Sequence, residues 1–171
     1  RDFHNKYVKQ LLIVNASDEA ETLVDMSVGR GGDLWKWHQS KLNFVLGFDL
    51  SKMNLENRKD GACARYLTFK GKHGNAPTCL FINANSGLNL RNKGGILDSK
   101  GKMLMDAIVG KGSKDKDVLG KVAYNNFGIG KEGFDVVSNM FSTHYFFENI
   151  EMLNEYLRNV SENCKINGYF I

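Results

Sequence analysis

Short apolar segments alternate with helical patterns along this 171-residue chain. Strands are predicted at 22–26, 44–48, 78–83 and 134–138, and a fifth is predicted to begin at 168. Helices are predicted at 3–13, at 33–39 with Asp33 as the cap, at 52–69 with a break near Gly61, and at 149–163. This alternation is typical of β-α-β units, so the sequence predicts an α/β fold on a parallel sheet. The length predicts a single domain over 1–171.

Two parts of the chain depart from this regular pattern. Residues 87–133 are rich in Gly and Lys, and we expect an exposed, loop-rich insertion there with one short helix at 103–109. The chain also stops inside its fifth predicted strand, which would leave an open sheet edge. It begins without Met and without an apolar leader. We therefore expect a fragment whose C-terminal part, beyond Ile171, is missing.

Composition excludes several classes of protein. Apolar residues make up 42% and charged residues 25%, and no run of 18 apolar residues occurs, so disordered, collagen-like and membrane-spanning chains are excluded. The net charge of +4 favours an anionic partner without indicating a polybasic one. Three cysteines without C-x-x-C spacing argue against a disulfide framework or a metal site, and favour an intracellular, reducing compartment.

The segment 23–37, LVDMSVGRGGDLWKW, is the most informative for function. A predicted strand enters a glycine-rich turn and then a helix, so backbone N–H groups are free and a ligand can approach the chain closely. Asp49 ends the next predicted strand, 20 residues after Gly29. In α/β sheets this spacing places a carboxylate near a ribose diol.

Two kinds of ligand fit that arrangement. Ser27, Gly29 and Gly32 approximate the G-x-G-x-x-G pattern of dinucleotide sites. Asp25 and Asp33 bracket the loop, however, and would repel a pyrophosphate, whereas the sulfonium of S-adenosylmethionine tolerates acids. The residues favour the methyl donor, with a dinucleotide and a glycine turn without a ligand as alternatives.

Several segments together resemble the mRNA cap (guanine-N7) methyltransferases, most like those of large DNA viruses. Residues 5–13 are similar to N-N-W-x-K-S-x-L-I and 24–37 to V-L-D-L-G-C-G-K-G-G-D-L-x-K-W, while 134–148 are similar to F-D-V-V-S-x-Q-F-x-x-H-Y-x-F-E. Residues 81–86 and 167–171 add to the match. The resemblance implies a Rossmann-like class I S-adenosylmethionine-dependent methyltransferase sheet. It also implies a capped RNA 5′ end (GpppN) as substrate, with other capping-enzyme domains or subunits as partners.

The resemblance also implies a role for particular residues. The methyl donor would be held by Lys9, Ser27, Gly29, Asp49, Asn85, Met140 and Tyr145, with Lys9 on its carboxylate and Asp49 on its ribose. The cap would be held by Asn5, Arg30, Lys36, Arg65 and His144. This chain departs from the family pattern at four of these positions. Ser27 replaces Gly, Asn85 replaces Asp, Met140 replaces Gln, and Arg30 replaces Lys, which keeps a phosphate-binding charge.

The chemistry of N7 methylation sets what the chain must supply. Guanine N7 carries a lone pair and no proton, so no general base is expected, and catalysis would come from positioning. Basic side chains would then neutralise the cap triphosphate. We expect Phe141, Phe146 and Phe147 to belong to the core. Lysines 100, 102, 111, 114 and 116 fit a solvated loop better than an RNA-binding patch. The alternatives are a methyltransferase for another substrate, a non-catalytic module that binds donor or RNA, and a dinucleotide oxidoreductase.

Overall fold

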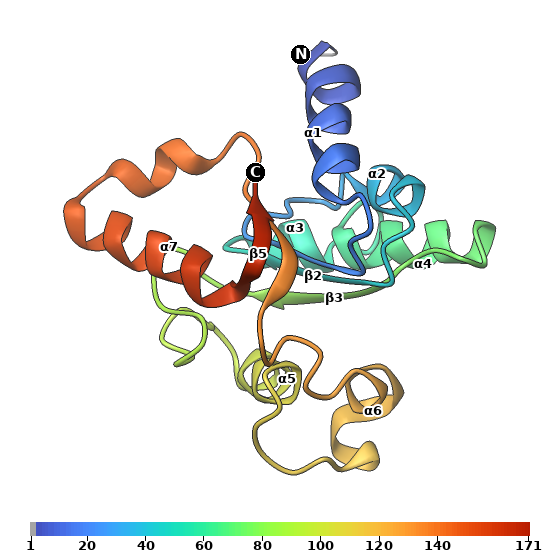
Figure 1. The fold of residues 1–171 in the computed structure, drawn as a ribbon. Coiled ribbons are helices and arrows are strands. Elements are labelled where there is room, and N and C mark those ends of the chain that lie inside the picture. The colour runs from blue at the N-terminus through green and yellow to red at the C-terminus, as the bar shows by residue number, and fades with distance from the viewer. Residues whose placement is uncertain (1–2) are drawn as a thin grey trace.

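A computed structural model describes residues 3–171 as five parallel strands between two layers of helices (Figure 1). The sheet order is β3-β2-β1-β4-β5. The strands are β1 Thr22–Asp25, β2 Phe44–Asp49, β3 Thr78–Asn83, β4 Phe134–Ser138 and β5 Cys164–Phe170. The helices are η1 His4–Val8, α1 Lys9–Ala16, α2 Leu34–Gln39, α3 Lys52–Glu56, α4 Ala62–Lys72, α5 Ser99–Ile108, α6 Lys116–Asn125, η2 Thr143–Phe147 and α7 Ile150–Asn163. The predicted α/β class and parallel sheet are confirmed, as is the break near Gly61.

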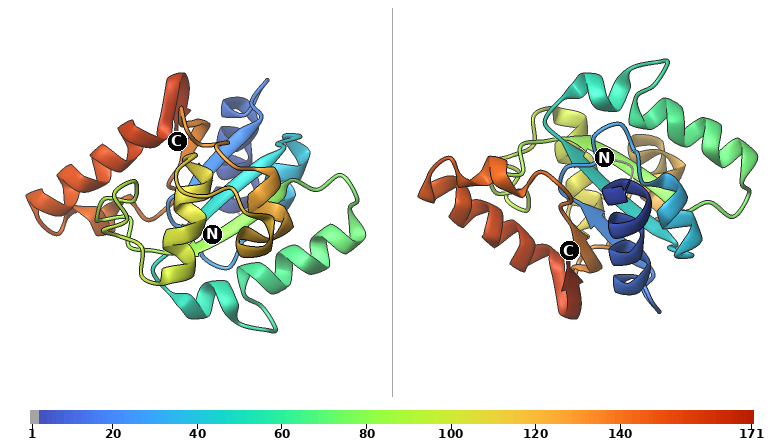
Figure 2. Two further views of the ribbon diagram at one scale, coloured as in Figure 1. Left: turned by 90° about the horizontal axis from the view of Figure 1, so that it is seen from below. Right: turned by 90° about the horizontal axis from the view of Figure 1, so that it is seen from above.

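The central strands β1 and β2 are buried on both faces, which explains why they read as nearly continuous apolar runs. On one face, Leu23, Val45 and Val136 belong to a core cluster that also holds buried residues of α1, α2, α3 and α4. On the other face, Val24, Leu46 and Val137 pack in the cluster that includes α5 and α6. Figure 2 shows these two helical layers from below and from above. Within residues 3–171, no helix is long and apolar enough to cross a membrane.

The short helix predicted at 103–109 is confirmed as α5, which begins earlier, at Ser99. The prediction of exposed loop over the rest of 87–133 is wrong for α6, which is a helix, and the expected exposure is wrong for α5. Leu104, Met105 and Ile108 of α5 lie in the core, and Met105 is fully buried. Gly101 lets α5 approach the sheet, because a Cβ atom there would lie 2.8 Å from Cγ2 of Ile82. The lysines of α5, Lys100 and Lys102, lie in its first turn and are exposed, and α6 follows this helix.

The sequence pattern also predicts apolar faces on the first and last helices, and the structure bears these out only in part. The predicted positions are Phe3, Tyr7 and Leu11 in the first helix and Ile150, Leu153, Leu157 and Val160 in the last. Phe3, Tyr7 and Leu11 are exposed, and the helical segment continues to Ala16, where Ile13 and Ala16 anchor it. In α7 the buried residues are Tyr156, Asn159 and Asn163. The predicted stripe of Ile150, Leu153, Leu157 and Val160 is exposed or half-buried. On the buried face of α7, Tyr156 stacks on Phe146 with ring centroids 4.1 Å apart, and Asn159 faces a polar loop.

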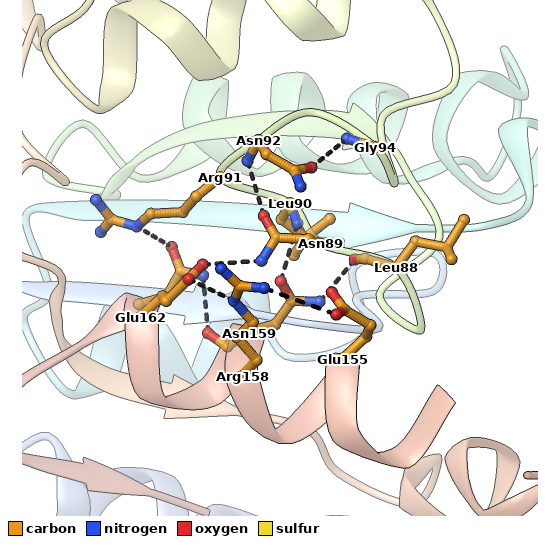
Figure 3. A network of polar contacts seen from close by, with 11 residues as sticks. Leu88, Asn89, Leu90, Arg91, Asn92, Gly94, Glu155, Arg158, Asn159 and Glu162 are labelled. Atoms are coloured by element: carbon orange, nitrogen blue, oxygen red, sulfur yellow. Dashed lines mark hydrogen bonds and ion pairs between the residues drawn. The ribbon is translucent and has the colours of Figure 1, made fainter. Parts of the chain in front are cut away.

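That loop, residues 86–95, is fastened to α7 by side-chain hydrogen bonds (Figure 3). The Asn159 amide donates to the carbonyls of Ser86 (2.9 Å) and Leu88 (2.7 Å), and its oxygen accepts from the Leu90 N–H (2.8 Å). Glu162 accepts from the Asn89 amide (3.0 Å). Since Asn159 is fully buried, these bonds fix the chain that leaves β3.

Candidate functional site

The carboxyl ends of the strands meet at one edge of the sheet because all neighbours are parallel. The register pairs Asp25, the last residue of β1, with Gly47 of β2 and Ser138 of β4. It also pairs Asp49, the last residue of β2, with Asn83 of β3. The segments that follow these ends form the candidate site, as expected for ligand sites in open α/β sheets.

Asp49 joins the end of β2 to the glycine-rich turn. One carboxylate oxygen accepts from the N–H of Gly29 at 2.8 Å. The other accepts from the N–H of Ser51 (2.9 Å) and from the Asn54 amide (3.1 Å). Gly29 has φ +57°, a left-handed conformation that favours glycine. The carboxylate is therefore held in place at the edge of the turn, and its remaining lone pair can still accept a hydrogen bond.

A cavity of about 540 Å³ opens beside Asp49, and we call it the β2–β3 cavity. Its lining combines apolar side chains with polar ones and consists of Met26, Ser27, Asp49, Leu50, Ser51, Asn54, Ala84, Asn85, Ser86, Ser142, Tyr145, Phe146, Glu148 and Met152. The structure thus brings together the predicted Ser27, Asp49, Asn85 and Tyr145. Met140 is half-buried and is not among these lining residues. The volume is in the range of small-molecule sites.

A second cavity of about 470 Å³, which we call the glycine-loop cavity, lies on the α1 side of the turn. It is lined by Asn5, Lys6, Lys9, Gln10, Ser27, Val28, Gly29, Gly32, Asp33, Trp35 and Lys36. Ser27 lines both cavities, so the two adjoin at this residue. The predicted donor residues Lys9 and Gly29 and the predicted cap residues Asn5 and Lys36 meet here.

Asp33 is the charged centre of the glycine-loop cavity. Its carboxylate is 2.5 Å from Nζ of Lys9 and 2.8 Å from Nζ of Lys36, and all three side chains are largely buried. Asp33 makes no side-chain cap of α2, which corrects the predicted role, because both of its oxygens are engaged by lysines. The three groups carry a net charge of about +1 at neutral pH, which favours an anion.

Burial also alters the acidity of Asp25, which lies beneath the turn. Its side chain accepts from the N–H of Ser27 at 2.9 Å. Desolvation, reinforced by the charge of Asp33, raises the pKa of Asp25 to about 7. Of the two acids predicted to bracket the loop, Asp25 is therefore partly protonated near neutral pH and Asp33 is paired with lysines.

The other predicted cap residues lie outside both cavities. Arg30 forms an ion pair with Asp60, and Arg65 donates to the carbonyl of Arg30 at 3.2 Å. His144 packs against Tyr145, with ring centroids 4.1 Å apart. The three side chains are exposed around the two openings. Their predicted roles stay predictions.

Sequence reasoning missed two residues of the site. Asn139, buried just after β4, accepts from the Ser27 hydroxyl (2.7 Å) and donates to the Tyr156 hydroxyl (2.7 Å). It therefore ties the glycine-rich turn to α7. Phe141 is 54% exposed, with φ +67° and with Nζ of Lys9 5.7 Å from its ring centroid.

The core role expected for the phenylalanines is correct for Phe146, which is buried, and wrong for Phe141 and for Phe147, which is 63% exposed. The positive φ of Phe141 is visible only in the folded chain, so no local sequence pattern identified this residue. Over residues 3–171, no group of three or more His, Cys, Asp or Glu side chains is placed to hold a metal ion.

Comparison with known proteins gives a consistent family relationship. No family model matches the chain. It is 26% identical over 171 residues to a probable mRNA-capping enzyme of Acanthamoeba polyphaga mimivirus, which covers 98% of this chain and 13% of that protein. It is 31% identical to the mRNA cap guanine-N(7) methyltransferase of Aspergillus niger, over all of this chain and 28% of that protein. The chain therefore resembles cap methyltransferases throughout, and spans less than a third of the length of either relative.

Solved structures give the same fold. The YcgJ protein of Bacillus subtilis superposes with a TM-score of 0.53 at 13% identity, over 96% of this chain and 49% of that one. A S-adenosylmethionine-dependent methyltransferase of Clostridium acetobutylicum superposes with a TM-score of 0.50 at 14% identity, over 98% of this chain and 48% of that one. The chain thus shares the Rossmann-like α/β fold of these proteins.

Proposed function

We propose that this chain is the methyl-donor-binding part of an mRNA cap guanine-N7 methyltransferase, which transfers a methyl group from S-adenosylmethionine to N7 of a GpppN cap. The observation that carries the proposal is the 31% identity to a cap guanine-N(7) methyltransferase over the whole chain. The two adjoining cavities at the sheet edge support it, because the reaction needs two ligands held side by side.

The residues at the turn fit the methyl donor better than a dinucleotide. Asp49 lies where it can accept from a ribose hydroxyl, and the apolar Met26, Ala84 and Phe146 can cover an adenine ring. Lys9 is placed to attract a carboxylate, although Asp33 already neutralises part of its charge. A pyrophosphate at the same turn would meet the carboxylate of Asp49, which already accepts from the Gly29 N–H, and this opposes NAD.

The chain's own contribution to catalysis is positioning. When bound, the donor supplies an electrophilic methyl group, and the guanine lone pair attacks it without a proton transfer. Asn139 and Ser27 hold the turn and the segment after β4 in one arrangement, so that both cavities keep a fixed relation. Lys36 and the exposed Arg30 and Arg65 would neutralise the cap triphosphate. We include further capping-enzyme domains or subunits as partners in this proposal.

The test is methyl transfer from radiolabelled S-adenosylmethionine to GpppA, with the product identified by digestion and chromatography. The proposal predicts label on guanine N7. Label on another position or molecule would make the chain a methyltransferase for a different substrate. Donor binding without methyl transfer would indicate a non-catalytic module. This outcome is included because Ser27 stands where the family pattern has Gly at the turn.

A further inference from the structure

A third hollow lies beyond the glycine-loop cavity, between α2 and α4, and we call it the α2–α4 groove. It has a volume of about 380 Å³ and is lined by Gly31, Gly32, Leu34, Trp35, Lys59, Arg65, Thr68, Phe69 and Lys72. Gly32 and Trp35 line both this groove and the glycine-loop cavity. A ligand that fills the cavity can therefore continue past Trp35 into the groove.

The groove is positively charged. Lys59, Arg65 and Lys72 line it, and no Asp or Glu within residues 3–171 lies within ion-pair distance of any of the three. The nearby Asp60 is already paired with Arg30. Helix α4 itself contains one Arg and two Lys and no acid. This uncompensated charge favours an anionic chain rather than a neutral one.

Trp35 lies where the glycine-loop cavity meets the α2–α4 groove, and its exposed ring packs against other aromatic rings. It is 53% exposed, yet its ring centroid is 5.4 Å from that of His73, 5.5 Å from that of His38 and 6.1 Å from that of Phe69. The neighbouring Trp37 is fully buried, so the two tryptophans of α2 have different roles. An exposed aromatic ring flanked by cations is how proteins bind unpaired bases.

We propose that the first nucleotides after the cap leave the glycine-loop cavity over Trp35 and enter the α2–α4 groove. One unpaired base stacks on Trp35, while Lys59, Arg65 and Lys72 bind backbone phosphates. This inference rests on the proposed function for the direction of the RNA. The groove is an RNA site separate from the predicted cap site. Only Arg65 belongs to both, and it would lie where the cap site meets the groove.

The competing location for RNA is the lysine-rich segment around α6, on the opposite helical layer (Figure 1). Lys111 and Lys116 are exposed there, as Lys59 and Lys72 are in the groove. They border neither of the two cavities at the glycine-rich turn. RNA held at α6 would lie on the other face of the sheet from the glycine-loop cavity.

The test compares a cap dinucleotide, GpppA, with an unstructured capped RNA of ten nucleotides. The wild-type chain is expected to show a KM about tenfold lower for the ten-nucleotide RNA. Lys59→Ala with Lys72→Ala should remove most of this length preference, and the charge-matched Lys111→Ala with Lys116→Ala should keep it. Trp35→Ala should weaken binding of the longer RNA by about fivefold or more, and Trp35→Phe should restore part of it.

Direct binding separates failure of this inference from failure of the proposed function. Fluorescence anisotropy of the uncapped ten-nucleotide RNA needs no turnover, so it reports on the groove even in an inactive chain. Loss of affinity in the Lys59/Lys72 variant without any methylation would support the groove and reject the activity. Equal KM values for the two substrates, equal losses in both lysine pairs, or equal binding of a poly-glutamate peptide would overturn the groove as an RNA site.

Discussion

The two helical layers cover opposite faces of one sheet, and they differ in what their polar residues do. Around α1 and α2, charged side chains such as Lys9 and Asp33 are gathered beside a cavity. Around α5 and α7, the polar Asn159 is buried in hydrogen bonds to a loop, and Met105 fills the core. The difference indicates that the first layer is built for a ligand and the second for holding the sheet edge in place.

The largest expected effect, on the free energy of unfolding, comes from a cavity-forming substitution in the core beneath α5. Met105→Ala should lower the free energy of unfolding by about 2–5 kcal/mol, because it removes a fully buried side chain that the surroundings cannot refill. Urea denaturation measures this. The control is Lys102→Ala, at an exposed position of the same helix, which should change the free energy of unfolding by less than about 0.5 kcal/mol. Equal effects of the two would mean that Met105 of α5 does not fill a packed core.

The Asn159 network should give the next largest effect. Asn159→Ala leaves the Leu90 N–H and the Ser86 and Leu88 carbonyls without their partner, so we expect a loss of about 2–3 kcal/mol in unfolding free energy. Asn154→Ala, at an exposed position of the same helix, is the matched control. If both variants unfold at the same urea concentration, the loop is not held by α7.

The sequence predicted the positions of the first four strands but placed the start of the fifth at 168, whereas β5 begins at Cys164. It was insufficient for the second helical layer. Strand positions were predictable because parallel strands buried on both faces give apolar runs between turns, as in Phe44–Asp49. Part of α5 was predicted as a short helix at 103–109, but its burial was not, because the surrounding segment is rich in Gly and Lys. The buried face of α7 was missed because it is made of Asn159 and Asn163, which follow no apolar period.

The candidate site was predictable to a similar extent. Asp49 and Gly29 were found from their spacing, and the structure joins them directly. The pairing of Lys9 with Asp33 depends on how α1 crosses the turn, and no local pattern encodes that. Asn139 was missed because a single Asn between a strand and a loop carries no spacing signal; only the folded chain brings it to Ser27.

A smaller effect is expected in the first layer, on binding rather than stability. Asp49→Asn keeps the shape of the side chain but removes its charge, so the affinity for S-adenosylhomocysteine should fall by about 1.5–3 kcal/mol. Isothermal titration calorimetry measures the change. Asp60→Asn, which touches only the exposed pair with Arg30, should bind the ligand like the wild type. If Asp49→Asn binds S-adenosylhomocysteine as tightly as the wild type, Asp49 does not bind the ribose.

The smallest expected effect concerns pH. The folded chain raises the pKa of Asp25 to about 7 by burial, so this carboxyl keeps its proton to a higher pH than in the unfolded chain. Its contribution to stability is therefore full below its ordinary pKa near 3.8 and is lost as the pH rises toward 7. Asp25→Asn should flatten this decline by at most about 1.4 kcal/mol per pH unit between pH 5 and 7. Urea titrations at several pH values measure the slope, and an unchanged slope would contradict the assignment.

The most direct test of the account is a crystal structure of the chain soaked with S-adenosylhomocysteine, with NAD soaked in parallel. We expect the nucleoside in the β2–β3 cavity, with its ribose at the Asp49 carboxylate and its amino-acid end toward the glycine-loop cavity. NAD bound across the same turn, or a β2–β3 cavity closed by side chains in both crystals, would contradict the account.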